Sequence, residues 1–144
     1  MKVHLSISRV LSHAPDVVWR KIRDFNGLPS WHPMIARSMI EDGKSGDQVG
    51  AVRSFYTHDG GYIREQLLAL DDRHFLTAYS ILESGMGVSD YVAEIRLHPI
   101  TLENTTLATW SAQFDCADDK AEELRQFIGQ TVFEGGLTHL QTLL

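Results

Sequence analysis

The last stretch of the chain, residues 118–144, constrains the fold most, because its apolar residues recur with the period of an α-helix. These residues are Ala121, Leu124, Ile128, Val132, Leu137, Leu140 and Leu144, with Phe127 and Phe133 beside them. The pattern predicts one long amphipathic helix, with Asp118 as its N-cap. With a rise of about 1.5 Å per residue, such a helix spans roughly 40 Å, enough to cross a domain of this size.

Three glycines lie within this helical pattern, at Gly129, Gly135 and Gly136. A glycine in a helix costs about 1 kcal/mol relative to alanine, so the missing side chains need a reason. Close packing against a neighbour, a bend, or space for a ligand would each explain them. We predict that at least one of the three faces the packed side of the helix, where a side chain would shrink a pocket or prevent close packing.

The composition indicates one globular domain, residues 1–144, with an ordinary 43% of hydrophobic and 22% of charged residues. The net charge is −6 and Lys and Arg form no cluster, so nucleic acid is not an expected partner. The N-terminus has no apolar signal core, and no apolar run is long enough to cross a bilayer. We therefore expect a cytoplasmic protein without membrane insertion. The single cysteine, Cys116, excludes an intrachain disulfide.

The residues before the long helix predict seven strands and two short helices. Alternation of apolar and polar residues predicts a first strand at 3–12. The segment 15–25 has helical periodicity after its leading proline, and the proline-interrupted segment 28–34 predicts a second helical turn. Six further strands are expected at 36–41, 49–57, 62–70, 75–82, 90–98 and 105–114.

Short loops between consecutive strands indicate an antiparallel sheet, and helices at the ends of the chain indicate an α+β fold. A strongly curved sheet of six or seven strands needs an element to fill its concave face. The long C-terminal helix is the expected filler.

Two hydrogen-bonding registers are open at the hairpin around residues 58–61. A three-residue loop with a bulge places Arg53 opposite Glu65, whereas a two-residue turn places Arg53 opposite Gln66. In the first register the two charges form either an ion pair in the concave face or an exposed pair on the outer face. The sequence leaves these alternatives open.

Two segments carry a resemblance to a known superfamily, namely Asp24-Phe25-Asn26-Gly27-Leu28-Pro29-Ser30-Trp31-His32-Pro33 and Ser89-Asp90-Tyr91. With the order of the elements, they resemble the helix-grip (SRPBCC) superfamily, which includes START lipid-transfer domains, Bet v 1 pollen allergens and bacterial polyketide cyclase/dehydrase-like proteins. The likeness covers nearly the whole chain and is closest to the bacterial group. It implies a seven-stranded sheet wrapped around the long helix, with a cavity between them for an apolar or aromatic small molecule.

Residues expected to face this cavity form the candidate ligand-binding site: Trp31, His32, Arg53, Phe55, Glu65, Tyr79, Tyr91, Trp110 and Phe133. Aromatic residues on apolar strand faces serve either as core or as cavity walls, and tyrosine hydroxyls offer polar contacts. Trp31 is either a core plug or part of a pocket entrance, and His32 is either a surface loop residue or a donor to a ligand at the mouth. Glu65 and Tyr79 are also catalytic candidates, because a desolvated carboxylate beside a tyrosine can act as a general acid or base.

The chain has no cofactor-binding motif, and its seven histidines are scattered, so neither a cofactor nor a metal is expected. Three functions stay open: binding or carrying a lipid-like, polyketide-like or aromatic molecule, a cofactor-free polyketide cyclase or dehydratase, and a structural module with a filled cavity. An open apolar cavity would favour the first, and an open cavity with a buried carboxylate the second. The sequence does not distinguish a monomer from a dimer.

Overall fold

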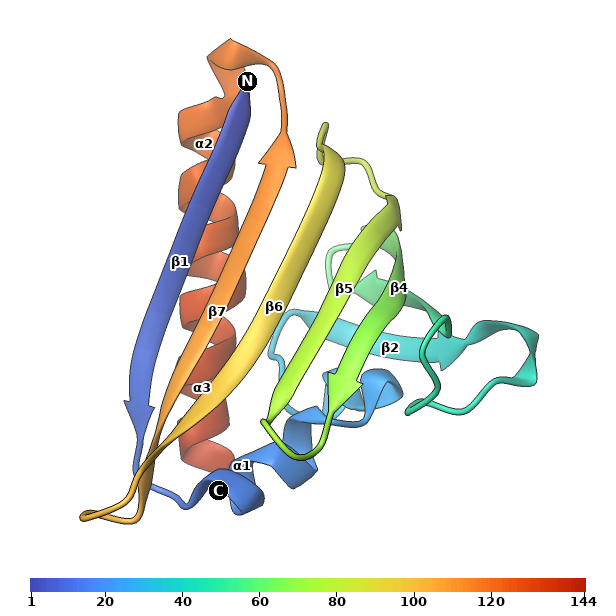
Figure 1. The fold of residues 1–144 in the computed structure, drawn as a ribbon. Coiled ribbons are helices and arrows are strands. Elements are labelled where there is room, and N and C mark those ends of the chain that lie inside the picture. The colour runs from blue at the N-terminus through green and yellow to red at the C-terminus, as the bar shows by residue number, and fades with distance from the viewer.

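The computed structural model describes residues 1–144 and consists of one seven-stranded antiparallel sheet, three short helical segments and a long C-terminal helix (Figure 1). The third short segment is a 3-10 turn (Glu41–Gly43) after the second strand. The strands are β1 (Lys2–Leu11), β2 (Ile35–Ile40), β3 (Val52–Thr57), β4 (Tyr62–Asp71), β5 (Leu76–Glu83), β6 (Ser89–Ile100) and β7 (Thr105–Asp115). Their order in the sheet is β1-β7-β6-β5-β4-β3-β2, so the strands from β2 onward form a meander and β1 pairs with the last strand. The predicted α+β helix-grip fold is confirmed.

The first helical segments follow β1 as predicted, as α1 (Pro15–Ile22) and a 3-10 helix (Phe25–Ser30). The predicted second turn at 28–34 therefore begins and ends earlier. The reason is Asp24, whose side chain accepts a hydrogen bond from the backbone of Asn26 at 3.0 Å and starts the turn there.

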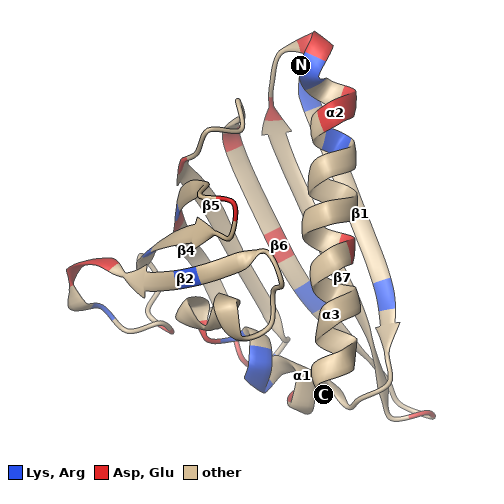
Figure 2. Ribbon diagram, turned by 180° about the vertical axis from the view of Figure 1, so that it is seen from behind, with Lys and Arg blue, Asp and Glu red and all other residues tan.

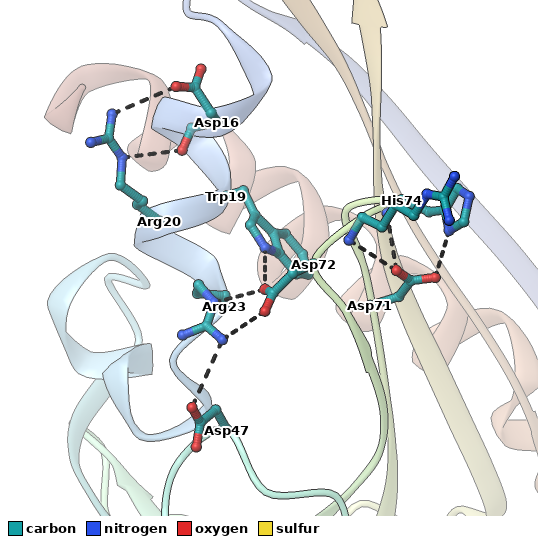
Figure 3. A network of polar contacts seen from close by, with 9 residues as sticks. Asp16, Trp19, Arg20, Arg23, Asp47, Asp71, Asp72 and His74 are labelled. Atoms are coloured by element: carbon teal, nitrogen blue, oxygen red, sulfur yellow. Dashed lines mark hydrogen bonds and ion pairs between the residues drawn. The ribbon is translucent and has the colours of Figure 1, made fainter.

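Polar contacts hold α1 against the β4–β5 turn (Figure 3). Asp72 in that turn accepts a hydrogen bond from the indole of Trp19 at 2.7 Å and two from Arg23 at 2.8 and 3.0 Å. Arg23 also lies 3.9 Å from Asp47, in the loop before β3. These contacts fix the chain that leads from α1 into the segment bordering the cavity.

The long C-terminal helix is confirmed, although it is not α-helical throughout. It runs through a 3-10 turn (Asp118–Lys120), α2 (Ala121–Gln126), a π-helical segment (Phe127–Glu134) and α3 (Gly135–Leu143). Acidic residues cluster in its first turns, where they interact favourably with the helix dipole (Figure 2). The predicted N-cap is wrong, because Asp118 makes no capping hydrogen bond and instead lies 3.6 Å from the amino group of Met1. Neither the C-terminal helix nor any other helix combines the length and the apolar character of a membrane span.

The glycines of this helix differ in their surroundings. A Cβ on Gly136 would lie 2.7 Å from Cδ2 of His32 and 3.0 Å from Cζ3 of Trp110, so only glycine fits there without a shift. Gly129 also faces the sheet, with ordinary contact distances, whereas a Cβ on Gly135 would meet only the carbonyl of Gln130 in the same helix. The prediction that at least one glycine faces the sheet is confirmed.

The β3–β4 hairpin adopts the register that pairs Arg53 with Glu65. Thr57 and Gly61 flank a three-residue loop, and the backbone amide of Thr57 donates to the Gly61 carbonyl at 2.9 Å. Gly60 takes a φ of 91°, which favours glycine and allows this loop length. The alternative register, with Arg53 opposite Gln66, does not occur.

Candidate ligand-binding site

A cavity of about 310 Å³ lies between the sheet and the C-terminal helix. Its walls come from β3, β4 and β5, with single residues of β6 and β7, the segment 28–35 and the π-helical segment. Fourteen of its 21 lining residues are hydrophobic, so the space is mainly apolar. Asp59 and Gly61 of the β3–β4 loop, Gly85 of the β5–β6 loop and the partly exposed Phe127 mark its open end.

A buried ion pair is the main polar feature of the cavity wall. Arg53 donates to Oε1 of Glu65 through Nε at 2.9 Å and through a terminal nitrogen at 2.7 Å, and both side chains are only 7% exposed. A third hydrogen bond from Arg53 goes to the Phe25 carbonyl at 2.9 Å, and the guanidinium lies 3.9 Å from the centroid of the Phe25 ring. Both hydrogen bonds to the carboxylate end on Oε1, so Oε2 accepts none from the protein.

Burial and charge act in opposite directions on this carboxylate. Desolvation raises the pKa of Glu65 above its ordinary value, and the Arg53 guanidinium limits the rise. A carboxylate in this position is a hydrogen-bond acceptor within an apolar wall. It can bind a donor or, with a reacting group in place, accept a proton.

Two tyrosines lie near this pair at the buried end. Trp110 donates from its indole nitrogen to the hydroxyl oxygen of Tyr79 at 3.0 Å. Burial, assisted by the negative charge of Glu65, raises the pKa of Tyr79, and burial likewise raises the pKa of Tyr91. Both hydroxyls therefore keep their protons at neutral pH and can donate hydrogen bonds.

Seven of the nine predicted ligand-binding residues line the cavity: His32, Arg53, Phe55, Glu65, Tyr79, Tyr91 and Trp110. Trp31 and Phe133 do not, which corrects their expected position. Phe133 is fully buried and stacks on Trp110 with ring centroids 4.5 Å apart, and Trp31 packs against Trp110 at 5.6 Å. Both rings contact Trp110 in the core, so Trp31 has the position of a core plug.

His32 lies in neither of the two predicted settings, since it is only 3% exposed and both ring nitrogens have backbone partners. Its Nε2 lies 2.7 Å from the carbonyl of Val132 in the π-helical segment, and its Nδ1 accepts from the Met34 amide at 3.2 Å. Burial lowers the pKa of His32 to about 4, so the ring is neutral at pH 7 with Nε2 as the donor. His32 thus ties the cavity wall to the helix and presents only ring carbons to a ligand.

The comparison with known families agrees with this architecture. A sequence profile for the family described as "Polyketide cyclase / dehydrase and lipid transport" matches residues 2–144. The chain belongs to this family. No curated protein sequence matches significantly.

Solved structures of similar proteins show how widely the family's fold is shared. The protein XoxI from Bacillus cereus is 30% identical, with a TM-score of 0.87 over 98% of this chain and 94% of its own. A protein from Thermobifida fusca is 26% identical, with a TM-score of 0.88 over 96% and 90% of the two chains. Norcoclaurine synthase from Thalictrum flavum, solved as a point mutant with a transition-state analogue, has a TM-score of 0.78 over 99% and 94%. Its 15% identity shows a common fold alone.

Two thirds of the cavity lining of this family member consists of residues that the sequence analysis did not single out. Ile63 and Ile81 lie on the same strand faces as Glu65 and Tyr79, so the two-residue period of a strand could have identified them. The others are Leu28, Met34, Ile35, Thr57, Asp59, Gly61, Tyr62, Gly85, Met86, Phe127, Ile128 and Val132. Most of these come from loops and from the helix, whose orientation over the sheet is not visible in the sequence.

Proposed function

We propose that residues 1–144 act as one domain that binds an apolar or aromatic small molecule in the cavity. The observation that carries this proposal is an open space of about 310 Å³ with a mainly hydrophobic lining. A dry apolar cavity of about 150 Å³ accommodates one benzene ring. The cavity therefore suits a molecule of roughly two rings, or a lipid-like chain of similar volume. The mention of polyketides and lipids in the family's description is consistent with such a ligand.

The apolar contacts alone would give weak binding. Burying about 300 Å² of ligand surface contributes about 7 kcal/mol at roughly 25 cal/mol/Å². Association costs at least about 4 kcal/mol. Hydrogen bonds to Glu65 and Tyr79 would consequently determine affinity and selectivity.

Thermal unfolding with two-ring aromatic compounds and lipid-like compounds tests the proposal, because a ligand of the folded state raises the melting temperature. Ile81→Trp should abolish the shift, since Ile81 lines the cavity and a larger ring would fill it. Leu82→Trp is the matched control, because Leu82 is the next residue of β5 and is 47% exposed. Loss of the shift in both variants, or in neither, would contradict binding in this cavity.

A second candidate function is cofactor-free acid–base catalysis of the cyclase or dehydratase type. The observation that favours it is Oε2 of Glu65, a carboxylate oxygen without a protein donor in the wall of an open cavity. In an enolisation, Glu65 would accept a proton from carbon next to a ketone, and Tyr79 would donate a hydrogen bond to the enolate oxygen.

The two-ring ketone 2-tetralone provides a test, with exchange of its acidic C–H hydrogens for deuterium followed by NMR. The protein should accelerate exchange, and Glu65→Gln should remove the acceleration. If Glu65→Gln exchanges 2-tetralone as fast as the unchanged protein, Glu65 is not the base. The third possibility, an interaction module with a filled cavity, is disfavoured by the open volume.

A further inference from the structure

Resting on the proposed function, we propose that the ligand carries a neutral hydroxyl group, an alcohol or a phenol, which donates to Glu65 and accepts from Tyr79. Carboxylate ligands are excluded from this site. The class of ligand thus follows from hydrogen-bonding groups at the buried end of the cavity.

The first part of the site is the unused oxygen of Glu65. The residue is only 6% exposed and lines the cavity. Both hydrogen bonds from Arg53 end on Oε1, which leaves Oε2 as an acceptor without a donor. Oε2 is not sealed from solvent, so a molecule in the cavity can reach it, and hydrogen bonds to a charged acceptor are stronger than those between neutral groups. A ligand with an O–H group supplies a donor to this oxygen.

The second part is the hydroxyl of Tyr79, a residue that is 4% exposed and also lines the cavity. Its oxygen already accepts a hydrogen bond from Trp110 at 3.0 Å, and the Tyr91 hydroxyl is a second neighbour for hydrogen bonding, so the group is oriented and can donate its own proton to a ligand. Tyr79 and Glu65 lie on neighbouring strands, in cross-strand positions two residues apart on one face. An acceptor and a donor at diagonal cross-strand positions of one face match a hydroxyl, which donates and accepts through one atom.

The surroundings disfavour charged head groups. The hydrogen bonds that Arg53 makes go to Glu65 and to the Phe25 carbonyl, so its charge is already compensated. A ligand carboxylate would approach the Glu65 carboxylate, past Asp59 at the open end, in a protein of net charge −6. An ammonium group would add an uncompensated positive charge beside a neutral ion pair, and isolated buried charges are strongly unfavourable.

Four ligands with one naphthalene skeleton separate these cases: naphthalene, 2-naphthol, 2-naphthoate and 2-naphthylmethylammonium. Their dissociation constants are measured with the whole chain at pH 7, where 2-naphthol is neutral, by titration of protein fluorescence. We expect 2-naphthol to bind at least roughly tenfold more tightly than naphthalene, because it gains one hydrogen bond to a charged acceptor. The naphthoate and the ammonium compound should bind more weakly than naphthalene.

Two variants assign the effect to the named atoms. Glu65→Gln removes the carboxylate charge and leaves Arg53 uncompensated, so it should lose most of the preference for 2-naphthol and bind 2-naphthoate more tightly. Tyr79→Phe should lower the affinity for 2-naphthol without improving 2-naphthoate. Tyr56→Phe, on the exposed face of β3, is the control and should change neither. If Glu65→Gln does not fold, the affinities of Tyr79→Phe for 2-naphthol and 2-naphthoate test the hydroxyl assignment.

Each result has a distinct meaning. Equal affinity for naphthalene and 2-naphthol would overturn the hydroxyl assignment while leaving the proposed binding function intact. Tightest binding of 2-naphthoate or of the ammonium compound would overturn it in favour of a charged head group. If none of the four binds, the proposed binding of two-ring aromatic molecules fails, and the hydroxyl assignment fails with it.

Discussion

Two ion pairs on neighbouring residues of β4 differ in the face of the sheet on which they lie. Glu65 pairs with Arg53 at 2.7 Å, and both side chains are 7% exposed. Arg64, the preceding residue, pairs with Glu41 at 2.7 Å on the opposite face, where the side chains are 31% and 27% exposed. Two ion pairs with the same charges and the same distance thus differ in burial, one being buried and the other partly exposed to solvent.

The difference shows that burial, not the partner, decides the direction in which each carboxylate is shifted. Hydrogen bonds from Arg64 lower the pKa of Glu41 to about 2, because little desolvation opposes them. The pKa of Glu65 is raised despite two hydrogen bonds from Arg53, because desolvation is the larger effect. The inner pair therefore places a polar group in the cavity at a cost in stability, whereas the outer pair is a surface contact.

Arg53→Met should give the largest effect on this comparison. The substitution leaves the Glu65 carboxylate buried without its partner, which destabilises a protein by about 3–5 kcal/mol. Urea unfolding at pH 7 measures the loss. The double variant Arg53→Met/Glu65→Leu carries no buried charge and should recover most of it. A single variant as stable as the double would show that the inner pair is no less hydrated than the outer one.

As the pH is lowered, the stability contribution of His32, at the cavity, should be lost at a higher pH than that of Glu41, on the opposite face of the sheet. The folded pKa of His32 is about 4, below its ordinary value of 6.5, so the unfolded chain takes up a proton first. Stability should therefore fall as pH decreases from 6.5 toward 4, by about 2 kcal/mol between pH 7.5 and 5. Glu41 also has a lowered pKa, and its contribution is lost only below 4.5, as pH falls toward about 2.

Urea unfolding of the protein and of His32→Gln across this range separates the two contributions. The glutamine can still donate to the Val132 carbonyl but does not titrate, so His32→Gln should lack the loss between pH 7.5 and 5. An unchanged pH profile in His32→Gln would mean that another group is responsible.

Gly136→Ala tests how closely the inner face is packed. Its Cβ would lie 2.7 Å from His32, so strain of about 1–3 kcal/mol should exceed the gain of about 1 kcal/mol in helix propensity. We expect a net loss of about 1 kcal/mol by chemical unfolding. Gly129→Ala is the matched control, because its Cβ would lie 3.8 Å from the nearest side-chain atom and should be neutral or stabilising. Equal effects at both positions would mean that the helix is free to move away from the sheet.

The sequence predicted the elements well because the periods of strands and helices are local properties. The inner ion pair was predictable only as an alternative, since one residue more or less in the hairpin loop exchanges Glu65 for Gln66 opposite Arg53. The positive φ of Gly60 allows the three-residue loop that pairs Arg53 with Glu65, and this backbone angle is not visible in the sequence. Local patterns therefore define the candidates, and the loop conformation decides which of them meet.

Contacts between distant segments were the part that could not be predicted. His32 is bound to Val132, a hundred residues later, through a backbone carbonyl that has no sequence signature. Phe133 was assigned to the cavity, yet the rotation of the helix places its ring on Trp110 in the core. Such errors arise because side-chain direction depends on how the helix packs over the sheet.

Arg64→Met should have the smallest effect on stability. The salt dependence of this effect distinguishes the exposed ion pair from the buried one. Exposed ion pairs contribute little, so we expect a loss of stability no larger than roughly a quarter of that in Arg53→Met. At about 1 M salt the screening length falls to about 3 Å, so the small effect of Arg64→Met should vanish while that of Arg53→Met persists. Urea unfolding of both variants at low and high salt checks this. If salt reduced both losses by the same fraction, the two ion pairs would be equally exposed to solvent, and burial could not explain the opposite pKa shifts of Glu41 and Glu65.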